Sequence, residues 1–224
     1  MLILAFDTTV AACSVALTHH PGATIARARE FMEQGQAEAL VPMVERVMGD
    51  ANAAYADLDR IAVTVGPGSF TGVRVGLAAA RALGLAADKP VIGVSSLEAL
   101  AAAVPDGERD THDAILAAID TKRGEIYVQT FEARTLRAKS APVALPPGDI
   151  AAWVNNARIV AVGDAAKAVV AAAPHATLSG ADAFPDPVVI AHLAAERAPD
   201  TSPVPLYVLP PKITLAPGGG RLRP

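Results

Sequence analysis

Three short segments of this 224-residue chain contain residues that could face a phosphate or a nucleotide. In one of them, an apolar run over 61–65 enters a Gly-Pro-Gly turn, and an apolar stretch with helical patterning leaves the turn at Val73. A strand, a glycine turn and a helix in this order place backbone N–H groups at a helix N-terminus, where anions are favoured. The other two segments are Asp-Thr turns that come directly after predicted strands. The candidate phosphate- or nucleotide-facing residues are Asp7, Thr8, Thr9, Gly66, Gly68, Ser69, Thr71 and Asp120.

The glycine turn lacks the two best-known phosphate-binding patterns. In a dinucleotide fingerprint, Gly-x-Gly-x-x-Gly, the third glycine position would be occupied by Thr71, and Gly72 comes one residue late. A P-loop has four residues between its glycines and a lysine after the second, whereas Gly68 and Gly72 are separated by three residues and Val73 comes next. On pattern alone, a tight connection is therefore a better interpretation than a phosphate cradle.

The composition is that of a globular protein without a nucleic-acid-binding surface of its own. With 52% apolar and 19% charged residues, the chain can form one large domain or two small ones. The net charge is −4 and lysine or arginine clusters only at Arg221 and Arg223, so independent tRNA binding is not expected. No uncharged apolar run reaches about 18 residues, so no membrane span is expected. The single Cys13 fits a reducing compartment, and we expect a cytoplasmic protein.

Strand and helix patterns alternate along the chain, and the opening arrangement occurs twice. A strand, an Asp-Thr turn and a second strand begin near residue 2 and again near residue 114, which indicates an internal duplication in an α/β fold. We predict strands at 2–6, 11–17, 24–30, 61–65, 91–94, 114–119, 125–131 and 158–162, and helices at 36–48, 73–87, 96–104, 149–155, 165–172 and 187–196. The expected units are an N-terminal subdomain (1–105), a C-terminal subdomain (106–200) and an extended, partly disordered tail (201–224).

Two of the predicted helices are more apolar than a surface helix requires. The helix at 36–48 has a broad apolar arc, and the helix at 73–87 carries only two charges, Arg74 and Arg81. Small residues recur every four positions in the second helix, at Gly72, Gly76, Ala80 and Gly84, which would let another helix approach closely. Two interpretations stay open. The helix at 73–87 is buried within its own domain, or the two helices form a surface for a partner.

Several motifs together resemble the TsaB (YeaZ) family. They are Asp7-Thr8-Thr9, the segment 66–76 with its helix, Val94-Ser-Ser-Leu-Glu-Ala-Leu100, Asp120-Thr-Lys-Arg-Gly-Glu-Ile-Tyr127 and Pro205-Leu-Tyr207. The resemblance covers most of the chain. It implies the actin/hexokinase-like (ASKHA) fold, in which two tandem ribonuclease-H-like subdomains flank a cleft.

The resemblance also implies a function without catalysis in this chain. A TsaB protein supports the related TsaD subunit, which transfers a threonylcarbamoyl group from threonylcarbamoyl-adenylate to the adenosine beside the anticodon of tRNAs that read ANN codons. The implied partners are a TsaD-like catalytic subunit and, through that heterodimer, a TsaE-like ATPase, with a homodimer when the chain is alone. The implied interface residues are Gln36, Leu40, Val44, Val47, Val73, Arg74, Gly76, Leu77, Ala80, Arg81, Leu83 and Gly84.

No catalytic residue, metal or cofactor is expected. TsaD has a His-x-x-x-His metal pair, and alignment of the preceding strand places Ser96 and Leu100 at those positions. Neither side chain can replace an imidazole as a metal ligand. The chain departs from the family at two other places, with Gln36 where a histidine is common and Val208-Leu209 where an arginine often comes after the tyrosine.

Two enzymatic alternatives remain. In an ATP-dependent phosphotransferase, Asp7 would bind Mg²⁺ through water and the segment 66–71 would hold phosphate, but Asp120 is the only matching candidate for a base. A peptidase would need a base or a metal beside Ser69 or Ser96, and no histidine is near either in sequence.

Overall fold

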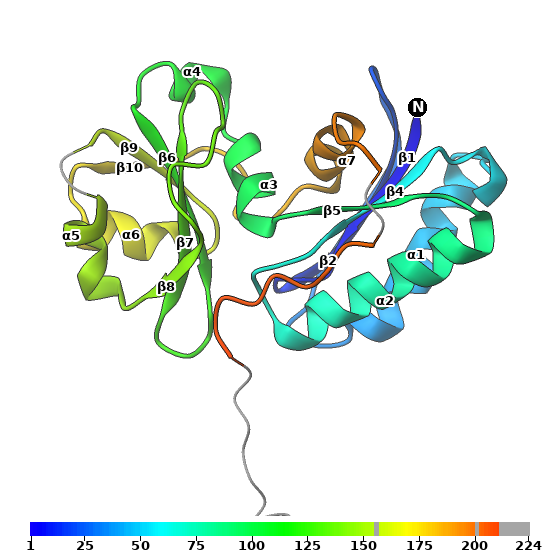
Figure 1. Cartoon of the computed structure of the whole chain (residues 1–224), viewed down its shortest axis with the longest axis horizontal. Helices are drawn as coiled ribbons and strands as arrows, with labels where there is room; N and C mark the ends of the chain where they lie inside the picture. Colours follow the sequence, from blue (N-terminus) through cyan, green and yellow to red (C-terminus); the bar gives the residue numbers. More distant parts are fainter. Residues whose placement is uncertain (155–156, 200–201, 211–224) are drawn as a thin grey trace, which may run out of the picture.

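The computed structural model describes residues 1–154, 157–199 and 202–210, which form two halves, each built on a five-stranded sheet (Figure 1). The first sheet has the order β3-β2-β1-β4-β5, with β1 at Leu2–Asp7, β2 at Ala12–His19, β3 at Thr24–Phe31, β4 at Arg60–Thr64 and β5 at Val91–Val94. The second has the order β10-β9-β6-β7-β8, with β6 at Ala114–Asp120, β7 at Ile126–Glu132, β8 at Val143–Leu145, β9 at Ile159–Val162 and β10 at Ala176–Leu178.

The two sheets have the same topology, which confirms the predicted duplication. The central strand β1 pairs antiparallel with β2 and parallel with β4, and β6 pairs in the same way with β7 and β9. Asp7 and Asp120 are the last residues of these two central strands. The two Asp-Thr turns therefore occupy equivalent places in the two halves.

Helices cover both faces of each sheet, which explains why the central strands are continuous apolar runs. On the first sheet, α1 (Gln36–Asp50) and α2 (Phe70–Ala87) pack on one face and α7 (Pro187–Ala195) on the other. On the second, α3 (Ser96–Ala102) packs against β6 and β7, and α5 (Ile150–Val154) and α6 (Ala166–Ala172) contribute to the core on the opposite side.

Two helices pack on the sheet that lies on the other side of the predicted division at residue 105. Helix α3 belongs to the predicted N-terminal segment but packs on the second sheet, and α7 belongs to the predicted C-terminal segment but packs on the first. The physical reason is that each sheet needs a helical layer on both faces to bury its apolar side chains. The chain therefore crosses between the halves more than once.

The predicted elements are present, with shifted ends and a few additions. Helix α2 begins at Phe70, three residues before the predicted start, because the Oγ of Ser69 accepts a hydrogen bond from the backbone N–H of Gly72. The Oγ of Ser95 makes no equivalent bond at the start of α3. The elements that the sequence did not predict are β8, β10, the short helix α4 (Asp106–Arg109) and two single 3₁₀ turns at Tyr55–Asp57 and Pro147–Asp149.

Helix α2 is, within the described residues, the one helix whose length and composition would let it cross a membrane. It packs along one side against β4 and α1, as a core helix does in a globular domain. A third of it is buried, so the interpretation that α2 is buried on every side is wrong.

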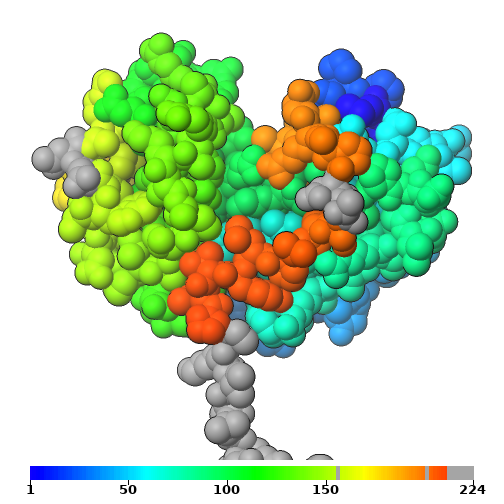
Figure 2. Space-filling model, viewed as in Figure 1, coloured from blue at the N-terminus to red at the C-terminus, as the bar shows by residue number. Residues whose placement is uncertain are grey.

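Residues 202–210 form neither helix nor strand and run from the first half to the second (Figures 1 and 2). The backbone N–H of Leu206 donates to the carbonyl of Val65 at 2.8 Å. The prediction of a disordered tail end falls on residues 211–224, which lie outside the described residues.

Candidate functional site

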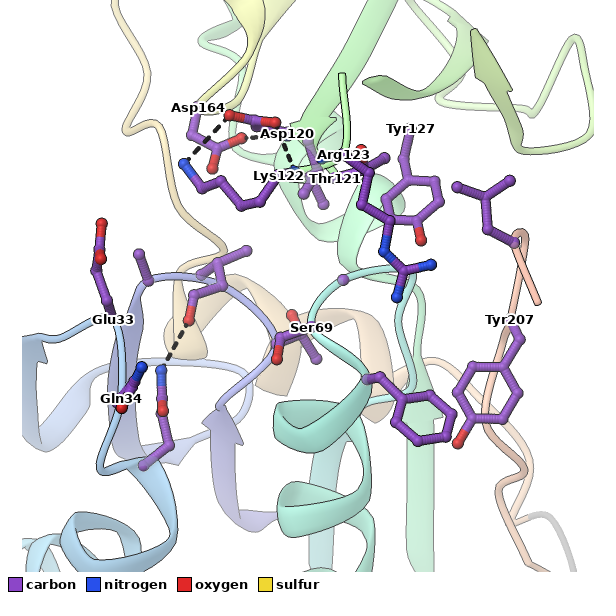
Figure 3. Close-up of a pocket in the computed structure, with 18 of the residues that line it drawn as sticks. Glu33, Gln34, Ser69, Asp120, Thr121, Lys122, Arg123, Tyr127, Asp164 and Tyr207 are labelled. Atoms are coloured by element: carbon purple, nitrogen blue, oxygen red, sulfur yellow. Dashed lines mark hydrogen bonds and ion pairs between the residues drawn. The ribbon is translucent and has the colours of Figure 1, made fainter. Parts of the chain in front are cut away.

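A pocket of about 440 Å³ lies between the two halves, where the glycine turn faces the second Asp-Thr turn (Figure 3). Its walls are formed by the residues after β1, by the loop before α1, by the glycine turn, by the β6–β7 turn and by residues 207–210. The lining residues are Thr9, Val10, Ala11, Glu33, Gln34, Gln36, Gly68, Ser69, Phe70, Ile119, Asp120, Thr121, Lys122, Arg123, Tyr127, Asp164, Tyr207, Leu209 and Pro210.

Half of the eight predicted phosphate-facing residues line this pocket. Those in the wall are Thr9, Gly68, Ser69 and Asp120, and those outside it are Asp7, Thr8, Gly66 and Thr71. The structure therefore brings the glycine turn and the second Asp-Thr turn together at the pocket. Asp7, the carboxylate that a metal-bound phosphate would need, lies outside it.

Asp7 is fully buried beneath Thr9 and has no access to the pocket. Its Oδ1 accepts hydrogen bonds from the Oγ1 of Thr64 at 2.5 Å and from the Oγ1 and backbone N–H of Thr9 at 2.6 and 3.1 Å. Its Oδ2 has no hydrogen-bond partner among the residues that the structure describes. Burial raises the pKa of this carboxyl above its ordinary value, and the hydrogen bonds from Thr64 and Thr9 offset that rise only in part. Burial thus makes this carboxyl group harder to ionise, and it keeps the group away from any phosphate or metal ion in the pocket.

The glycines of the turn are needed for packing against the first Asp-Thr turn. A Cβ on Gly72 would lie 1.9 Å from the carbonyl oxygen of Thr8, and one on Gly68 would lie 2.3 Å from that of Thr9. A Cβ on Gly76 would lie 2.7 Å from the Oγ1 of Thr8. Two of the small residues of α2, Gly72 and Gly76, therefore contact this chain's own first turn, and a third, Gly84, lies against Val91 of β5. The close approach of another helix to this stripe stays a prediction.

The backbone donors at the start of α2 are partly used within the chain. The N–H of Ser69 donates to the carbonyl of Thr9 at 2.7 Å, and the N–H of Gly72 donates to the Oγ of Ser69 at 3.3 Å. A phosphate at this helix end would have to compete with both bonds. The tight connection that the pattern favoured is thus the better description of the turn.

The second half supplies the charged wall of the pocket. Asp120 pairs with the Nζ of Lys122 at 3.2 Å, and its backbone N–H donates to Asp164 at 2.8 Å (Figure 3). Burial raises the pKa of Asp164, while the Asp120 amide and the Lys122 charge lower it. The Asp120 carboxylate is already paired with an ammonium group and is not placed as a free base.

Arg123, Tyr127 and Tyr207 lie on the other side of the pocket. Their contribution and that of Lys122 and Asp164 were not predicted. Lys122 and Arg123 could have been found, because they come directly after an Asp-Thr turn that matches the first one. Tyr207 belongs to the Pro205-Leu-Tyr207 motif of the resemblance, but that motif did not predict a place in the pocket, because Tyr207 reaches the wall only through the path of residues 202–210.

The residues present do not fit the metal-bound phosphate group that this type of cleft implies. Ser96 is buried, with its Oγ 2.9 Å from the Oγ1 of Thr9, and Leu100 lies in the core. Within the described ranges, no three histidine, cysteine, aspartate or glutamate side chains gather as metal ligands do. Cys13 is also buried, which raises the pKa of its thiol to about 12 and leaves it unreactive.

The expected interface residues divide into two sets. Most of them lie in the core formed by α1, α2 and the first sheet, so their side chains do not reach the surface of this chain. These are Leu40, Val44, Val47, Val73, Gly76, Leu77, Ala80 and Gly84. Gln36 is half-buried and donates to the carbonyls of Val10 and Met32. Arg74 and Arg81 are exposed and Leu83 is half-buried.

Comparison with known proteins gives the family. Residues 30–167 match the family model described as TsaD, tRNA N6-adenosine threonylcarbamoyltransferase. The chain is 38% identical over 132 residues to the tRNA threonylcarbamoyladenosine biosynthesis protein TsaB of Escherichia coli K12, which covers 59% of this chain and 55% of the relative. It is 46% identical over 89 residues to the tRNA N6-adenosine threonylcarbamoyltransferase of Erythrobacter litoralis, which covers 39% of this chain and 26% of the relative. The matches span about half the length of the curated TsaB relatives.

The fold comparison extends over nearly the whole chain. YeaZ from Pseudomonas aeruginosa superposes with a TM-score of 0.77 and 29% identity, covering 92% of this chain and 99% of the other. An activator of 2-hydroxyisocaproyl-CoA dehydratase from Clostridium difficile shares the fold at a TM-score of 0.52 and 10% identity, over 87% of this chain and 94% of the other. The predicted actin/hexokinase-like fold and the predicted TsaB (YeaZ) kinship are confirmed. The chain therefore belongs to the family described as TsaD, tRNA N6-adenosine threonylcarbamoyltransferase.

Proposed function

We propose that this chain is a non-catalytic subunit that supports a TsaD-type protein in forming threonylcarbamoyl-adenosine on tRNA. The names of its relatives supply the pathway, and the match to both TsaB and TsaD sequences supports a pair of related subunits. The observation that carries a supporting role is the burial of Asp7, which lies beneath Thr9 and outside the pocket. A phosphotransferase of this fold would need that carboxylate at the phosphates.

The surface proposed for the partner is the outer face of α1 and α2, named here the α1–α2 face. Leu85 is 86% exposed and Val41 is 50% exposed, and neither is among the apolar side chains that the first sheet buries. Three small apolar residues of α2 are exposed as well: Ala78, Ala82 and Ala86. An apolar face of this kind on the surface of a globular protein is typical of a protein-binding site.

The α1–α2 face replaces the interface residues expected from sequence. The buried set, such as Leu40 and Val44, holds the two helices on the sheet, and the exposed set beside it meets the partner. With no partner present, the same face would pair two copies of this chain. A TsaE-like ATPase would join by way of the heterodimer, and the assembly would be cytoplasmic.

The experiment is a binding measurement with a purified TsaD-type partner. Leu85→Asp places a charge on the exposed apolar surface of α2 without touching the core, and we expect at least about a tenfold loss of affinity because the carboxylate must be desolvated. Leu178→Asp is the matched control, since Leu178 is a half-exposed leucine on β10, in the other half of the molecule. Equal affinity of the Leu85→Asp variant and the parent protein would contradict the proposed surface.

The competing phosphotransferase function is tested by calorimetric titration with ATP and Mg²⁺. The sealed Asp7 and the paired Asp120 predict no turnover of ATP by the chain alone. Tight binding together with ATP consumption would favour the enzyme instead.

A further inference from the structure

The segment 203–210, named here the strap, is fixed to the first half at its beginning. Pro203 is buried, and its Cβ lies 2.7 Å from the position that a Cβ on Gly93 of β5 would take. The carbonyl of Pro203 accepts a hydrogen bond from the guanidinium of Arg81 at 2.7 Å. Further on, the N–H of Leu206 donates to the carbonyl of Val65 at 2.8 Å. The strap therefore starts as an extra segment alongside β5 and α2.

The end of the strap is fixed to the second half. Val208 and Leu209 pack against the core that includes Tyr127 of β7, and the guanidinium of Arg123 donates to the carbonyl of Pro210 at 3.3 Å. Figure 2 shows the strap in orange-red, crossing the front of the molecule between the green second half and the blue-green α2. Tyr207, Leu209 and Pro210 are also part of the pocket wall. One segment thus touches α2, both halves and the pocket.

The only two charged residues of α2 are both used to hold the strap. Besides the bond from Arg81, the Nε of Arg74 donates to the hydroxyl of Tyr207 at 2.9 Å. The Arg74 guanidinium also stacks on the ring of Phe70, 3.7 Å from its centre, and the Phe70 and Tyr207 rings lie 5.3 Å apart. Arginine on an aromatic face adds a cation–π attraction to the hydrogen bond. Both arginines thus have a defined task within this chain.

We propose that the strap is a latch that couples the α1–α2 face to the pocket between the halves. In the latched state, Arg74 and Arg81 hold the strap on α2, and the strap in turn holds the pocket wall at Arg123. In the released state, Tyr207 and Pro210 leave the wall together. A partner that docks on α2 in the latched state stabilises the closed pocket, and by linkage a closed pocket strengthens docking by the same factor.

The latch is tested first on the chain alone, by hydrogen exchange of the Leu206 amide and of the Arg123 amide, which donates to the Oγ1 of Thr121 at 3.0 Å. The variants are Arg74→Ala and Tyr207→Phe, and Arg46→Ala on the exposed side of α1 is the control. Loss of a hydrogen bond that involves a charged group should speed exchange at both amides by about tenfold, with no change in the control. Unchanged exchange at Leu206 would overturn the latch, and faster exchange at Leu206 alone would overturn its coupling to the pocket.

The coupling to α2 rests on the proposed function and is tested with a TsaD-type partner. Partner binding should slow exchange of the Leu206 and Arg123 amides in the parent protein, and Arg74→Ala should weaken binding although Leu85 is intact. Partner binding that leaves both amides unchanged would overturn the coupling. If no partner binds at all, the proposed function fails, while the latch is still decided by the exchange of the free chain.

Discussion

The two Asp-Thr turns occupy equivalent places in the duplicated halves, yet their surroundings differ. Asp7 is fully buried, and within the described part of the chain three donors bind one carboxylate oxygen and none binds the other. Asp120 faces the pocket and pairs with Lys122. The same two residue types at the same strand end thus give a sealed polar cluster in one half and an open charged wall in the other.

The difference comes from the segment that leaves the neighbouring parallel strand in each half. After β4, the glycine turn leads into the 18-residue helix α2, and its glycines let the helix lie directly on Thr8. After β9, the turn at Gly163-Asp164 leads into α6, which has 7 residues, and Asp164 binds the backbone of Asp120. One half carries a long helix with exposed apolar side chains, and the other carries the charged side of the pocket.

The largest effect is expected from closing the space above the first turn. Gly72→Ala would bring a Cβ to 1.9 Å from the Thr8 carbonyl, so the helix or the turn must move, and we expect a loss of about 3 kcal/mol or more in the free energy of unfolding. Urea denaturation measures this loss. In the second half, Gly107 of α4 has no atom within 4 Å of an added Cβ, so Gly107→Ala should be neutral or stabilising by up to about 1 kcal/mol. A Gly72→Ala variant as stable as Gly107→Ala would show that the close contact between α2 and Thr8 does not stabilise the fold.

A pH-dependent effect is expected at Asp7. Its native pKa is raised by burial above the ordinary value of 3.8, so the native state holds this proton more tightly than the unfolded chain does. The carboxyl therefore contributes its full stability below pH 3.8, and that contribution is lost as the pH rises through the native pKa. Asp7→Asn should remove this loss, so the variant gains stability relative to the parent protein as the pH rises.

Thermal unfolding across the pH range measures the Asp7 effect. Asp110→Asn at an exposed site is the control and should behave like the parent protein at every pH. A variant that becomes less stable than the parent as the pH rises would show that Asp7 is ionised and needed as a carboxylate.

The smallest effect is expected at the open turn. Lys122→Met removes a positive charge that lowers the pKa of Asp164, so this pKa should rise further, as an NMR titration of the carboxyl carbon would show. The Lys122 side chain is 65% exposed, and we expect the free energy of unfolding to stay within about 0.5 kcal/mol. An unchanged pKa of Asp164 in the Lys122→Met variant would contradict the electrostatic effect of Lys122 on this carboxyl group.

The sequence predicted the duplication, the fold class and nearly every long element, because apolar runs and turn residues are local signals. It did not predict that Asp7 is sealed. That outcome depends on the fit between Gly68, Gly72 and the carbonyls of Thr8 and Thr9, which are about sixty residues away in the chain and meet only after folding.

The limits of the sequence are also visible on α2. Its composition is apolar nearly all round, so the pattern could not say which residues face the sheet and which face outward. The structure assigns Leu77 and Ala80 to the core and Leu85 to the surface. The sequence also did not predict where the strap lies. Its contacts with Arg74, Arg81 and Arg123 are made by an irregular segment, which has no periodic pattern of apolar residues.

The most direct test is a threonylcarbamoylation assay on tRNA, with a TsaD-type partner, its ATPase and threonylcarbamoyl-adenylate, in which this chain carries Asp7→Asn. A buried carboxyl group with a structural role predicts the same yield of modified adenosine as the parent protein gives, because the variant keeps the fold and the α1–α2 face. Loss of modification by an Asp7→Asn variant that is folded and still binds the partner would contradict a non-catalytic role for this chain.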